Sequence, residues 1–457
     1  MRGLPGDLAR ARIEGVPVAT AAPGKTAEST DAGLGGGGAW RAVTAGVIAA
    51  FVGFASSFAV VLEGLAKVGA THAQAASGLM ALLVTMGICA IFLSLRSRLP
   101  ISIAWSTPGA ALLAGSAVPH GGFPVAVGAF LVTGVLIVAS GLWQPLGRWV
   151  SAIPAPLANA MLAGILLPLC LAPAQAVKSD PAIGLAVVLT WAVVGSVRKL
   201  YAVPAAVVVA VVLIATTTHI KTDTLGPMWP HPVAVAPHFT VAAVVGIALP
   251  LYVVTMASQN IPGIAVLGAN GYHPRPGPLF GWTGVFSLLS APFGGHAVNL
   301  AAITAALCAG EEAGPDRSRR YRAAATAGGV YILLGLAASA AVALVDAAPP
   351  HIIEAVAGLA LLGALAGSLT AAMADPGQRE AAVVTVVVTV SGVTFFGVSG
   401  AFWGLLAGGA LYGVRHWQSR RAAAVAPAGV PAQQQGAGPA GPAAAGPASD
   451  PPEPDRS

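Results

Sequence analysis

Charged side chains are scarce in this sequence. They account for 9% of its 457 residues, whereas a soluble domain carries about 25%. Hydrophobic residues make up 56% of the chain, and the mean hydropathy is +0.78. This composition excludes a soluble enzyme, a nucleic-acid-binding protein and a disordered chain, and it predicts a protein embedded in a lipid bilayer.

Cysteine is also rare, since the sequence contains three, Cys89, Cys170 and Cys308. Each lies inside an apolar stretch, which excludes a disulfide framework and a thiolate metal site. The apolar stretches contain no paired carboxylates, His/Cys cluster, phosphate-binding loop or nucleophile motif. We therefore expect neither an enzyme nor a bound metal or cofactor.

Hydrophobic blocks of about 15 to 25 residues follow one another through most of the chain and predict fourteen membrane spans. The expected spans are 41–62, 73–95, 101–115, 122–140, 150–172, 182–197, 202–218, 239–259, 276–293, 294–310, 323–345, 351–373, 380–398 and 400–415. Residues 1–40 have no apolar core of signal-peptide length, so we expect a disordered cytoplasmic segment. Residues 416–457 are rich in Ala, Pro, Gly and Gln, and we expect a disordered cytoplasmic tail.

The positions of the basic residues agree with fourteen spans and cytoplasmic termini. With this count, 20 of the 23 Lys and Arg residues lie in cytoplasmic segments, and Lys67, Lys178 and Lys221 lie outside. Cytoplasmic loops of membrane proteins carry such an excess of Lys and Arg. One missed span would exchange the side of every later loop, so this distribution favours the count.

Two short segments recur at nearly the same offset. GLAKVGA at Gly64–Ala70 matches GIAVLGA at Gly263–Ala269, and AALLAG at Ala110–Gly115 matches AALCAG at Ala305–Gly310. The offsets of 199 and 195 residues place the matches in the first and eighth spans and in the third and tenth spans. With seven spans per copy, the second copy is inverted, which is typical of secondary transporters that bind substrate at the membrane midplane.

The third span is too short to cross the bilayer as a helix. Ile101–Gly115 would form a helix of ~22 Å, whereas the hydrocarbon core is ~30 Å thick. Alternating residues from Ile101 to Ser106 predict a strand, and Thr107 and Pro108 predict the N-cap and first residue of a half-helix. The tenth span, Phe293–Gly310, has the same ingredients. Two half-helix N-termini aimed at one point favour an anionic ligand.

Three stretches of sequence resemble the BenE family of benzoate:proton symporters: SSFAVVLEGLAKVGA, LPISIAWSTPGAALLAG, and MASQNIPGIAVLGANGY through APFGGHAVNLAAITAA. The resemblance extends from Trp40 to about Tyr412. It implies an all-α polytopic fold related to the uracil and xanthine permeases, with a seven-plus-seven inverted repeat. It also implies a core domain from spans 1–4 and 8–11 (41–140 and 239–345) and a gate domain from spans 5–7 and 12–14 (150–218 and 351–415). Substrate would lie between the strands of spans 3 and 10, beside spans 1 and 8.

Ten polar or aromatic residues are candidates for contact with the substrate. They come from the first, third, eighth and tenth spans: Ser56, Ser57, Ser102, Trp105, Ser106, Thr107, Gln259, Asn260, His296 and Asn299. Their alternative roles are close packing for Ser and Thr, bonds between helices for the amides, and interface anchoring for Trp105. The nucleobase permeases offer a carboxylate in the eighth span, whereas Gln259 and Asn260 are amides, which suits an anionic substrate.

His296 and Glu63 are the candidates for carrying a coupled proton. His296 is the histidine that our count places within a span and away from a loop, and imidazole titrates near neutral pH. Its alternative role is that of a neutral ring bonded to the backbone. Glu63 ends the first span, and we favour an interfacial pair with Lys67 in an i,i+4 arrangement.

The sequence therefore predicts a multi-pass protein of the inner membrane that imports benzoate or a similar aromatic carboxylate with a proton. The expected partners are this small anion, the proton and the bilayer, and no nucleic acid. A permease for another small anion or a nucleobase and a passive anion channel are the alternatives. Whether the chain forms a homodimer is left open.

Overall fold

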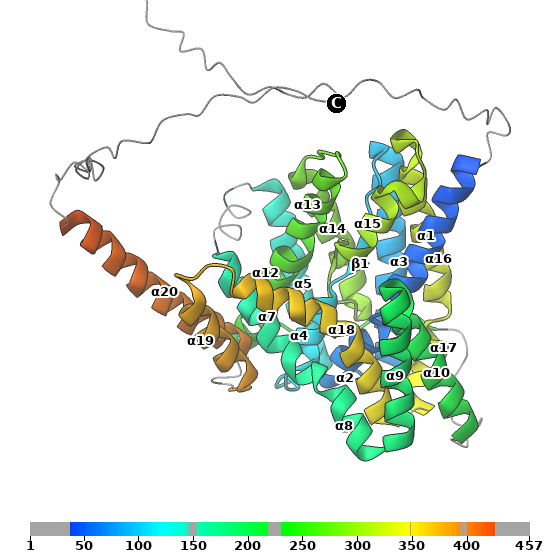
Figure 1. The fold of residues 1–457 in the computed structure, drawn as a ribbon, viewed down its shortest axis with the longest axis horizontal. Helices are drawn as coiled ribbons and strands as arrows, with labels where there is room; N and C mark the ends of the chain where they lie inside the picture. Colours follow the sequence, from blue (N-terminus) through cyan, green and yellow to red (C-terminus); the bar gives the residue numbers. More distant parts are fainter. Residues whose placement is uncertain are drawn as a thin grey trace, which may run out of the picture.

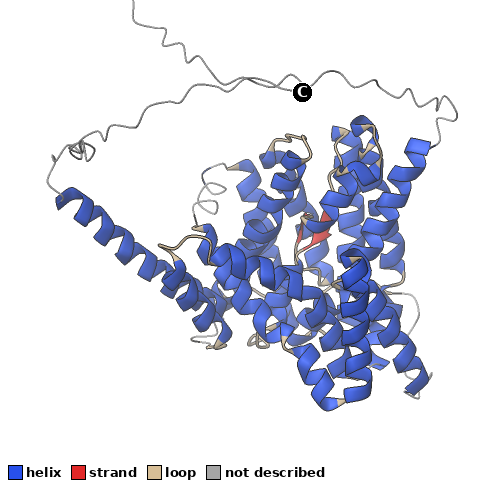
Figure 2. Cartoon of the chain, in the orientation of Figure 1, coloured by secondary structure: helices blue, strands red, loops and turns tan. Residues whose placement is uncertain are grey.

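The computed structural model describes residues 37–143, 145, 153–217, 230–347, 349–393, 395 and 400–425. The chain is almost wholly helical in these ranges, with two short strands in its middle (Figures 1 and 2). Residues 1–36 and 426–457, Arg148 and Lys221 lie outside the described residues, and what we expect of them stays a prediction.

The first half of the chain forms the following elements: α1 (Gly37–Ala55), α2 (Phe58–Lys67), α3 (His72–Ser97), β1 (Ile103–Trp105), α4 (Thr107–Ala114), α5 (Phe123–Leu142), α7 (Ala155–Cys170), α8 (Ala172–Ser179), α9 (Pro181–Val197), η1 (Lys199–Tyr201) and α10 (Ala202–Thr217). The second half forms α11 (Val241–Ala243), η3 (Val244–Ala248), α12 (Leu249–Thr255), η4 (Met256–Asn260), α13 (Ile261–Ala269), α14 (Pro276–Ser290), η5 (Ala291–Phe293), β2 (Val298–Leu300), α15 (Ile303–Ala309), η6 (Glu311–Ala313), η7 (Arg317–Arg319), α16 (Tyr321–Leu336), α17 (Ala338–Ala347), α18 (Pro350–Ala372), α19 (Arg379–Val390) and α20 (Gly400–Val425).

Among the described residues, six helical runs are long and apolar enough to cross a membrane, by length and composition: Trp40–Lys67, His72–Ser97, Phe123–Leu142, Ala155–Ser179, Val241–Ala269 and His351–Ala372. The helices Pro181–Val197 and Ala202–Thr216 are apolar but shorter. Each of the other expected spans contains a shorter helix, except the last, which contains the 26-residue α20. A strand precedes the helix in the third and tenth. The chain is therefore a mostly helical membrane protein.

The third span contains a strand followed by a short helix, as predicted, but its details differ. The strand β1 covers three residues, Ile103–Trp105, rather than all six from Ile101 to Ser106. The N-cap of α4 is Ser106 and not Thr107, because the Ser106 hydroxyl accepts the backbone N–H of Gly109 at 3.1 Å. Ser and Thr are both good caps, so the hydrogen bond decides between them.

The tenth span repeats this arrangement. The strand β2 follows β1 at the same offset of 195 residues that separates Ala305 from Ala110. The two strands pair antiparallel, with Ala104 opposite Asn299 and Trp105 opposite Val298. The Ser106 N–H also donates to the Ala297 carbonyl at 3.0 Å, which ties the N-cap of α4 to the residue before β2. Both strands lie in the middle of the molecule (Figure 2).

Helix α20 continues to Val425, so residues 416–425 are helical rather than part of a disordered tail. The tail was predicted to start too early because the Ala, Pro and Gly composition of residues 426–457 was extended over them. Arg, Gln and Ala are good helix formers, and the first proline after Gly400 is Pro427.

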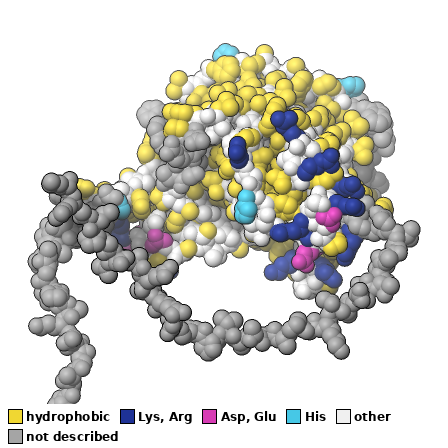
Figure 3. Space-filling view, turned by 90° about the horizontal axis from the view of Figure 1, so that it is seen from above, with side chains coloured by type: hydrophobic (Ala, Val, Ile, Leu, Met, Phe, Trp, Pro, Cys, Tyr) yellow, Lys and Arg dark blue, Asp and Glu magenta, His cyan; other side chains and the backbone are white. Residues whose placement is uncertain are grey.

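The loops that follow α3, α13 and α15 lie together at one end of the molecule. Arg98 donates to the Tyr321 hydroxyl and lies 4.8 Å above its ring, and Arg317 donates to the Asn270 carbonyl. Lys and Arg side chains gather on this face (Figure 3). At the other end, Gly69 packs against Val118 of the loop after α4.

Arg320 lies in the loop after α15 and is 5% exposed. Its guanidinium donates to the carbonyls of Ala309 at 2.8 Å and Gly314 at 2.7 Å, and so caps the C-terminal end of α15. In the same loop, the Ser318 hydroxyl and N–H donate to Asp316. These bonds hold the pKa of the Asp316 carboxyl below its usual value.

Candidate functional site

A small cavity lies where the two strand-helix elements meet. Its volume is about 50 Å³. The lining comes from α1, the turn after it, α3, α16, η4 and both strand-helix elements: Val52, Gly53, Ser56, Ser57, Met86, Ala104, Trp105, Thr107, Gln259, Ala301, Ala302, Thr304 and Tyr331. The first turns of α4 and α15 thus contribute Thr107 and Thr304 to one cavity.

Five of the ten predicted substrate contacts line this cavity: Ser56, Ser57, Trp105, Thr107 and Gln259. These five come from the segments predicted as the first, third and eighth spans, whereas Met86 of α3 and Tyr331 of α16 come from segments that gave no candidate. Within the described part of the chain, no group of three or more His, Cys, Asp or Glu residues could hold a metal ion.

Most polar groups of the lining already have partners in the protein. The hydroxyls of Ser56 and Ser57 donate to the Gly53 carbonyl, at 3.1 and 3.2 Å. Trp105 donates its indole N–H to Ser57 at 2.9 Å, and the hydroxyl of Thr304 is 3.0 Å from that of Ser102.

The Thr107 hydroxyl and the Gln259 amide differ from these groups. Neither side chain makes a hydrogen bond with the described residues. The residues directly before their elements are joined, because the Thr255 hydroxyl donates to the Ser106 hydroxyl at 2.8 Å. At this cavity, the side chains of Thr107 and Gln259 therefore have unused hydrogen-bonding capacity.

Three other predicted residues support the cavity without lining it. Ser102 bonds to Thr304, and Ser106 caps α4 and accepts from Thr255. Asn260 is fully buried and accepts the backbone N–H of Leu300 at 2.9 Å, which fixes η4 against β2. Asn260 therefore makes a hydrogen bond between neighbouring elements, which is the alternative role considered for it.

His296 and Asn299 are both fully buried but do not line the cavity. Nδ1 of His296 accepts the Ala297 N–H at 2.7 Å, and its ring lies edge-on to Phe130 of α5, with centroids 6.4 Å apart. Nε2 of His296 and Oδ1 of Asn299 have no hydrogen-bond partner among the described residues. Asn299 donates to the Leu300 carbonyl at 2.8 Å.

Glu63 lies within α2, four residues before its last residue Lys67, and does not line the cavity. Its carboxylate is 3.6 Å from the Lys67 ammonium, and Lys67 is half exposed. The predicted i,i+4 pair is therefore present. Glu354 of α18 is close enough for its charge to act on Glu63.

Eight residues of the lining were not among the predicted contacts: Val52, Gly53, Met86, Ala104, Ala301, Ala302, Thr304 and Tyr331. The repeat offset of 195 residues carries Thr107 to Ala302 and not to Thr304, so the repeat does not identify Thr304. Met86 and Tyr331 lie in ordinary apolar helices, and no sequence signal distinguishes them from packing residues.

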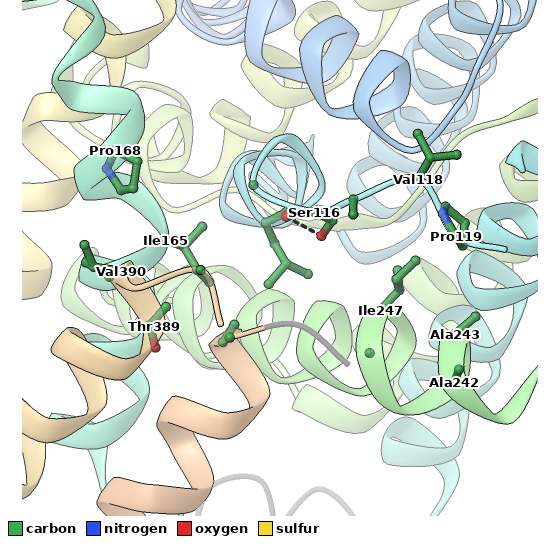
Figure 4. Close-up of a pocket in the computed structure, with 18 of the residues that line it drawn as sticks. Ser116, Val118, Pro119, Ile165, Pro168, Ala242, Ala243, Ile247, Thr389 and Val390 are labelled. Atoms are coloured by element: carbon green, nitrogen blue, oxygen red, sulfur yellow. Dashed lines mark hydrogen bonds between the residues drawn. The ribbon is translucent and has the colours of Figure 1, made fainter. Parts of the chain in front are cut away.

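A larger cavity of about 620 Å³ lies beyond the C-terminal end of α4 (Figure 4). Ala243 and Ile247 line it on one side, and Ile165, Thr389 and Val390 line it on the other. None of the predicted site residues belongs to its lining. The small cavity lies at the start of α4 and the larger one beyond its end. Since α4 has eight residues, its length of ~12 Å separates the two cavities.

Comparison with known proteins gives one family. The family model described as benzoate membrane transport protein, BenE, matches residues 39–414. Inner membrane protein YdcO of Escherichia coli (strain K12) is 41% identical over 368 residues, which cover 80% of this chain and 94% of YdcO. The benzoate membrane transport protein of Acinetobacter baylyi is 30% identical over 367 residues, which cover 80% of this chain and 93% of that protein.

Two solved structures, of a bicarbonate transporter and of SLC26A9, have a similar fold. The transmembrane domain of the cyanobacterial bicarbonate transporter BicA has a TM-score of 0.55 at 15% identity, and the match covers 82% of this chain and 96% of BicA. SLC26A9 has a TM-score of 0.55 at 13% identity, and the match covers 82% of this chain and 66% of SLC26A9. At these identities the likeness concerns the fold alone.

Proposed function

Because the chain belongs to the benzoate membrane transport family, BenE, whose members are membrane transporters and not enzymes, we propose that it imports benzoate or a similar aromatic carboxylate together with a proton. The family resemblance seen in the sequence is thereby confirmed. The observation that carries the proposed substrate is the cavity at the starts of α4 and α15, where Thr107 and Gln259 have unused hydrogen-bonding capacity.

The proposed binding mode places the carboxylate against Thr107 and Gln259. A charge at the middle of a bilayer costs at least ~2.5 kcal/mol, so the site must compensate it. Hydroxyl and amide donors and the N-terminal end of α4 provide this compensation without a fixed charge. The apolar part of the lining, which includes Val52, Ala301 and Ala302, then faces the ring.

The cavity must enlarge before it can hold an aromatic ring. Its volume is about 50 Å³, whereas a cavity of roughly 150 Å³ holds benzene. We therefore propose that the structure represents a contracted state of the site. The larger cavity lies between helices assigned to the core (α4, α11) and to the gate (α7, α19, α20), and it is the proposed route of access.

We further propose fourteen spans in two inverted halves, with core residues 41–140 and 239–345 and gate residues 150–218 and 351–415, in the inner membrane. The antiparallel pairing of β1 with β2 at the repeat offset supports this. The loop contacts also support it, because loops after even-numbered spans meet at one end and loops after the first and third spans meet at the other.

Cysteine labelling from either side of the membrane tests the topology. Single cysteines at Arg198 and Arg319 are expected to react from the cytoplasmic side, and those at Lys178 and Lys221 from outside, because basic loops are retained inside. A control cysteine in the C-terminal segment should react from the cytoplasm. A cysteine at Lys221 that reacts only from the cytoplasm would contradict the fourteen-span arrangement.

Uptake of labelled benzoate by proteoliposomes, with and without an imposed pH gradient, tests the function itself. We expect accumulation above equilibrium only with the gradient. A passive channel would show equilibration without accumulation. A transporter for a small inorganic anion, which the small cavity and the BicA-like fold favour as the second candidate, would show uptake of labelled bicarbonate that benzoate does not inhibit.

Replacing Gln259 with alanine is expected to raise the KM for benzoate roughly tenfold to a hundredfold. The reason is that a hydrogen bond to a charged group contributes about 1.5 to 3 kcal/mol. Concentration-dependent uptake measures the effect. Gln175→Ala removes an exposed amide on α8 and serves as the matched control with an unchanged KM. An unchanged KM in Gln259→Ala would remove Gln259 from the binding site.

A further inference from the structure

The small cavity has one wall made by two large side chains from neighbouring helices. Met86 of α3 and Tyr331 of α16 both line it, and each is 1% exposed. They belong to a different helix pair from Thr107 and Gln259, which come from α4 and η4. If the carboxylate bonds to Thr107 and Gln259, as in the proposed function on which this inference rests, the ring extends toward Met86 and Tyr331.

The backbones behind this wall are in direct contact and have no room to approach further. A Cβ atom on Gly87 would lie 2.5 Å from the Gly328 carbonyl oxygen, and one on Gly328 would lie 2.6 Å from the Gly87 carbonyl oxygen. Gly87 is adjacent to Met86, and Gly328 is one helical turn before Tyr331. The crossing of α3 and α16 therefore fixes the backbone positions from which both side chains project.

The depth of the cavity then depends on side chains rather than on helix positions. Met86 is unbranched and flexible, so it can move aside for a ring. The Tyr331 hydroxyl is held more firmly, because it packs directly on Gly53, where a Cβ atom would lie 2.5 Å from it. The space gained when the site expands is therefore limited by the volumes of Met86 and Tyr331.

We infer that Met86 and Tyr331 determine the size of the aromatic carboxylate that the transporter accepts, so that one-ring acids enter and fused two-ring acids are excluded. The Met86 side chain can move and so adjusts this size limit, whereas the Tyr331 side chain is held in place. No charge is involved, so the selection depends on volume alone and acts at the end of the substrate away from the carboxylate.

The test compares uptake of labelled benzoate and labelled 2-naphthoate by the full-length protein in proteoliposomes. In wild type, the kcat/KM ratio of 2-naphthoate to benzoate is expected to be low. Met86→Ala should raise this ratio at least tenfold, since even one methylene in an apolar pocket changes discrimination by about tenfold or more. Met86→Leu, which has nearly the same volume, should keep the low ratio. The ratio does not depend on the amount of protein inserted.

Leu79→Ala is the matched control, because Leu79 is fully buried on the same helix and does not line the cavity. It should lower stability as Met86→Ala does and leave the ratio unchanged. If Met86→Ala does not insert, Met86→Val is the second variant and should raise the ratio by a smaller factor. If wild type takes up benzoate but Met86→Ala and Met86→Val leave the ratio of 2-naphthoate to benzoate unchanged, this inference alone is overturned. Absence of benzoate uptake by wild type would overturn the proposed function and this inference with it.

Discussion

Replacing Gly53 with valine is expected to reduce benzoate uptake to the background of empty vesicles. Gly53 lines the cavity, and a Cβ atom there would lie 2.5 Å from the Tyr331 hydroxyl and 3.2 Å from Cγ2 of Thr304. Valine adds two further methyl groups to a space of about 50 Å³. Its side chain would occupy the volume that the substrate needs. Labelled benzoate uptake in proteoliposomes measures the loss.

In the Gly53→Ala variant, the loss of uptake is expected to be reversed by a second substitution. We expect at least a tenfold loss of uptake, which corresponds to about 1.4 kcal/mol. Combining it with Tyr331→Phe should restore much of the loss, because the next ring atom, Cζ, is 3.6 Å from the added Cβ. Gly329→Ala on α16 is the control, since nothing lies within 4 Å of its Cβ position. Equal uptake by wild type and Gly53→Val would show that substrate does not pass through this cavity.

The position of the small cavity could be predicted from local features of the sequence. The short third span, its alternating residues and the Ser106, Thr107 and Pro108 series predict a strand and a half-helix, and the structure contains both. The repeat then predicts the tenth-span counterpart at the same offset. These features are local in sequence, so pattern and length are enough to identify them.

The wall of the cavity and the side to which His296 turns could not be predicted in this way. Met86 and Tyr331 reach the cavity because α3 and α16 cross at Gly87 and Gly328, which are 241 residues apart in the sequence. His296 lies between η5 and β2, in the segment predicted as the tenth span, and its ring contacts Phe130 of α5. Such contacts depend on how distant helices pack, and a single sequence carries little information on them.

Replacing His296 with glutamine is expected to abolish accumulation driven by a pH gradient while benzoate exchange continues. Hydrogen-bond donors such as Thr107 and Gln259 bind a carboxylate but move no proton with it. A coupled proton therefore needs a titratable group. Glu63 is already paired with Lys67 at 3.6 Å. His296 has a free Nε2 among the described residues and is the better candidate.

The contacts of His296 suggest how its proton would be linked to the substrate. Nδ1 accepts the Ala297 N–H, so the neutral ring carries its hydrogen on Nε2. A proton added at Nδ1 would turn it into a donor and break this bond. The Ala297 carbonyl in turn accepts from Ser106, the N-cap of α4. Protonation would therefore disturb the residue next to the start of α4, where the carboxylate is proposed to bind.

Accumulation and exchange are measured on the same proteoliposomes, the first with an imposed pH gradient and the second with benzoate on both sides and no gradient. Glutamine retains hydrogen-bonding groups but does not titrate, so the loss of accumulation alone identifies a proton role. His238→Gln, at an exposed position in the loop before α11, is the control and should accumulate benzoate as wild type does. If His296→Gln also concentrates benzoate like wild type, His296 is a structural residue. The coupled proton must then be carried elsewhere, and Glu63→Gln, next to the charge of Glu354, is expected to lose accumulation instead.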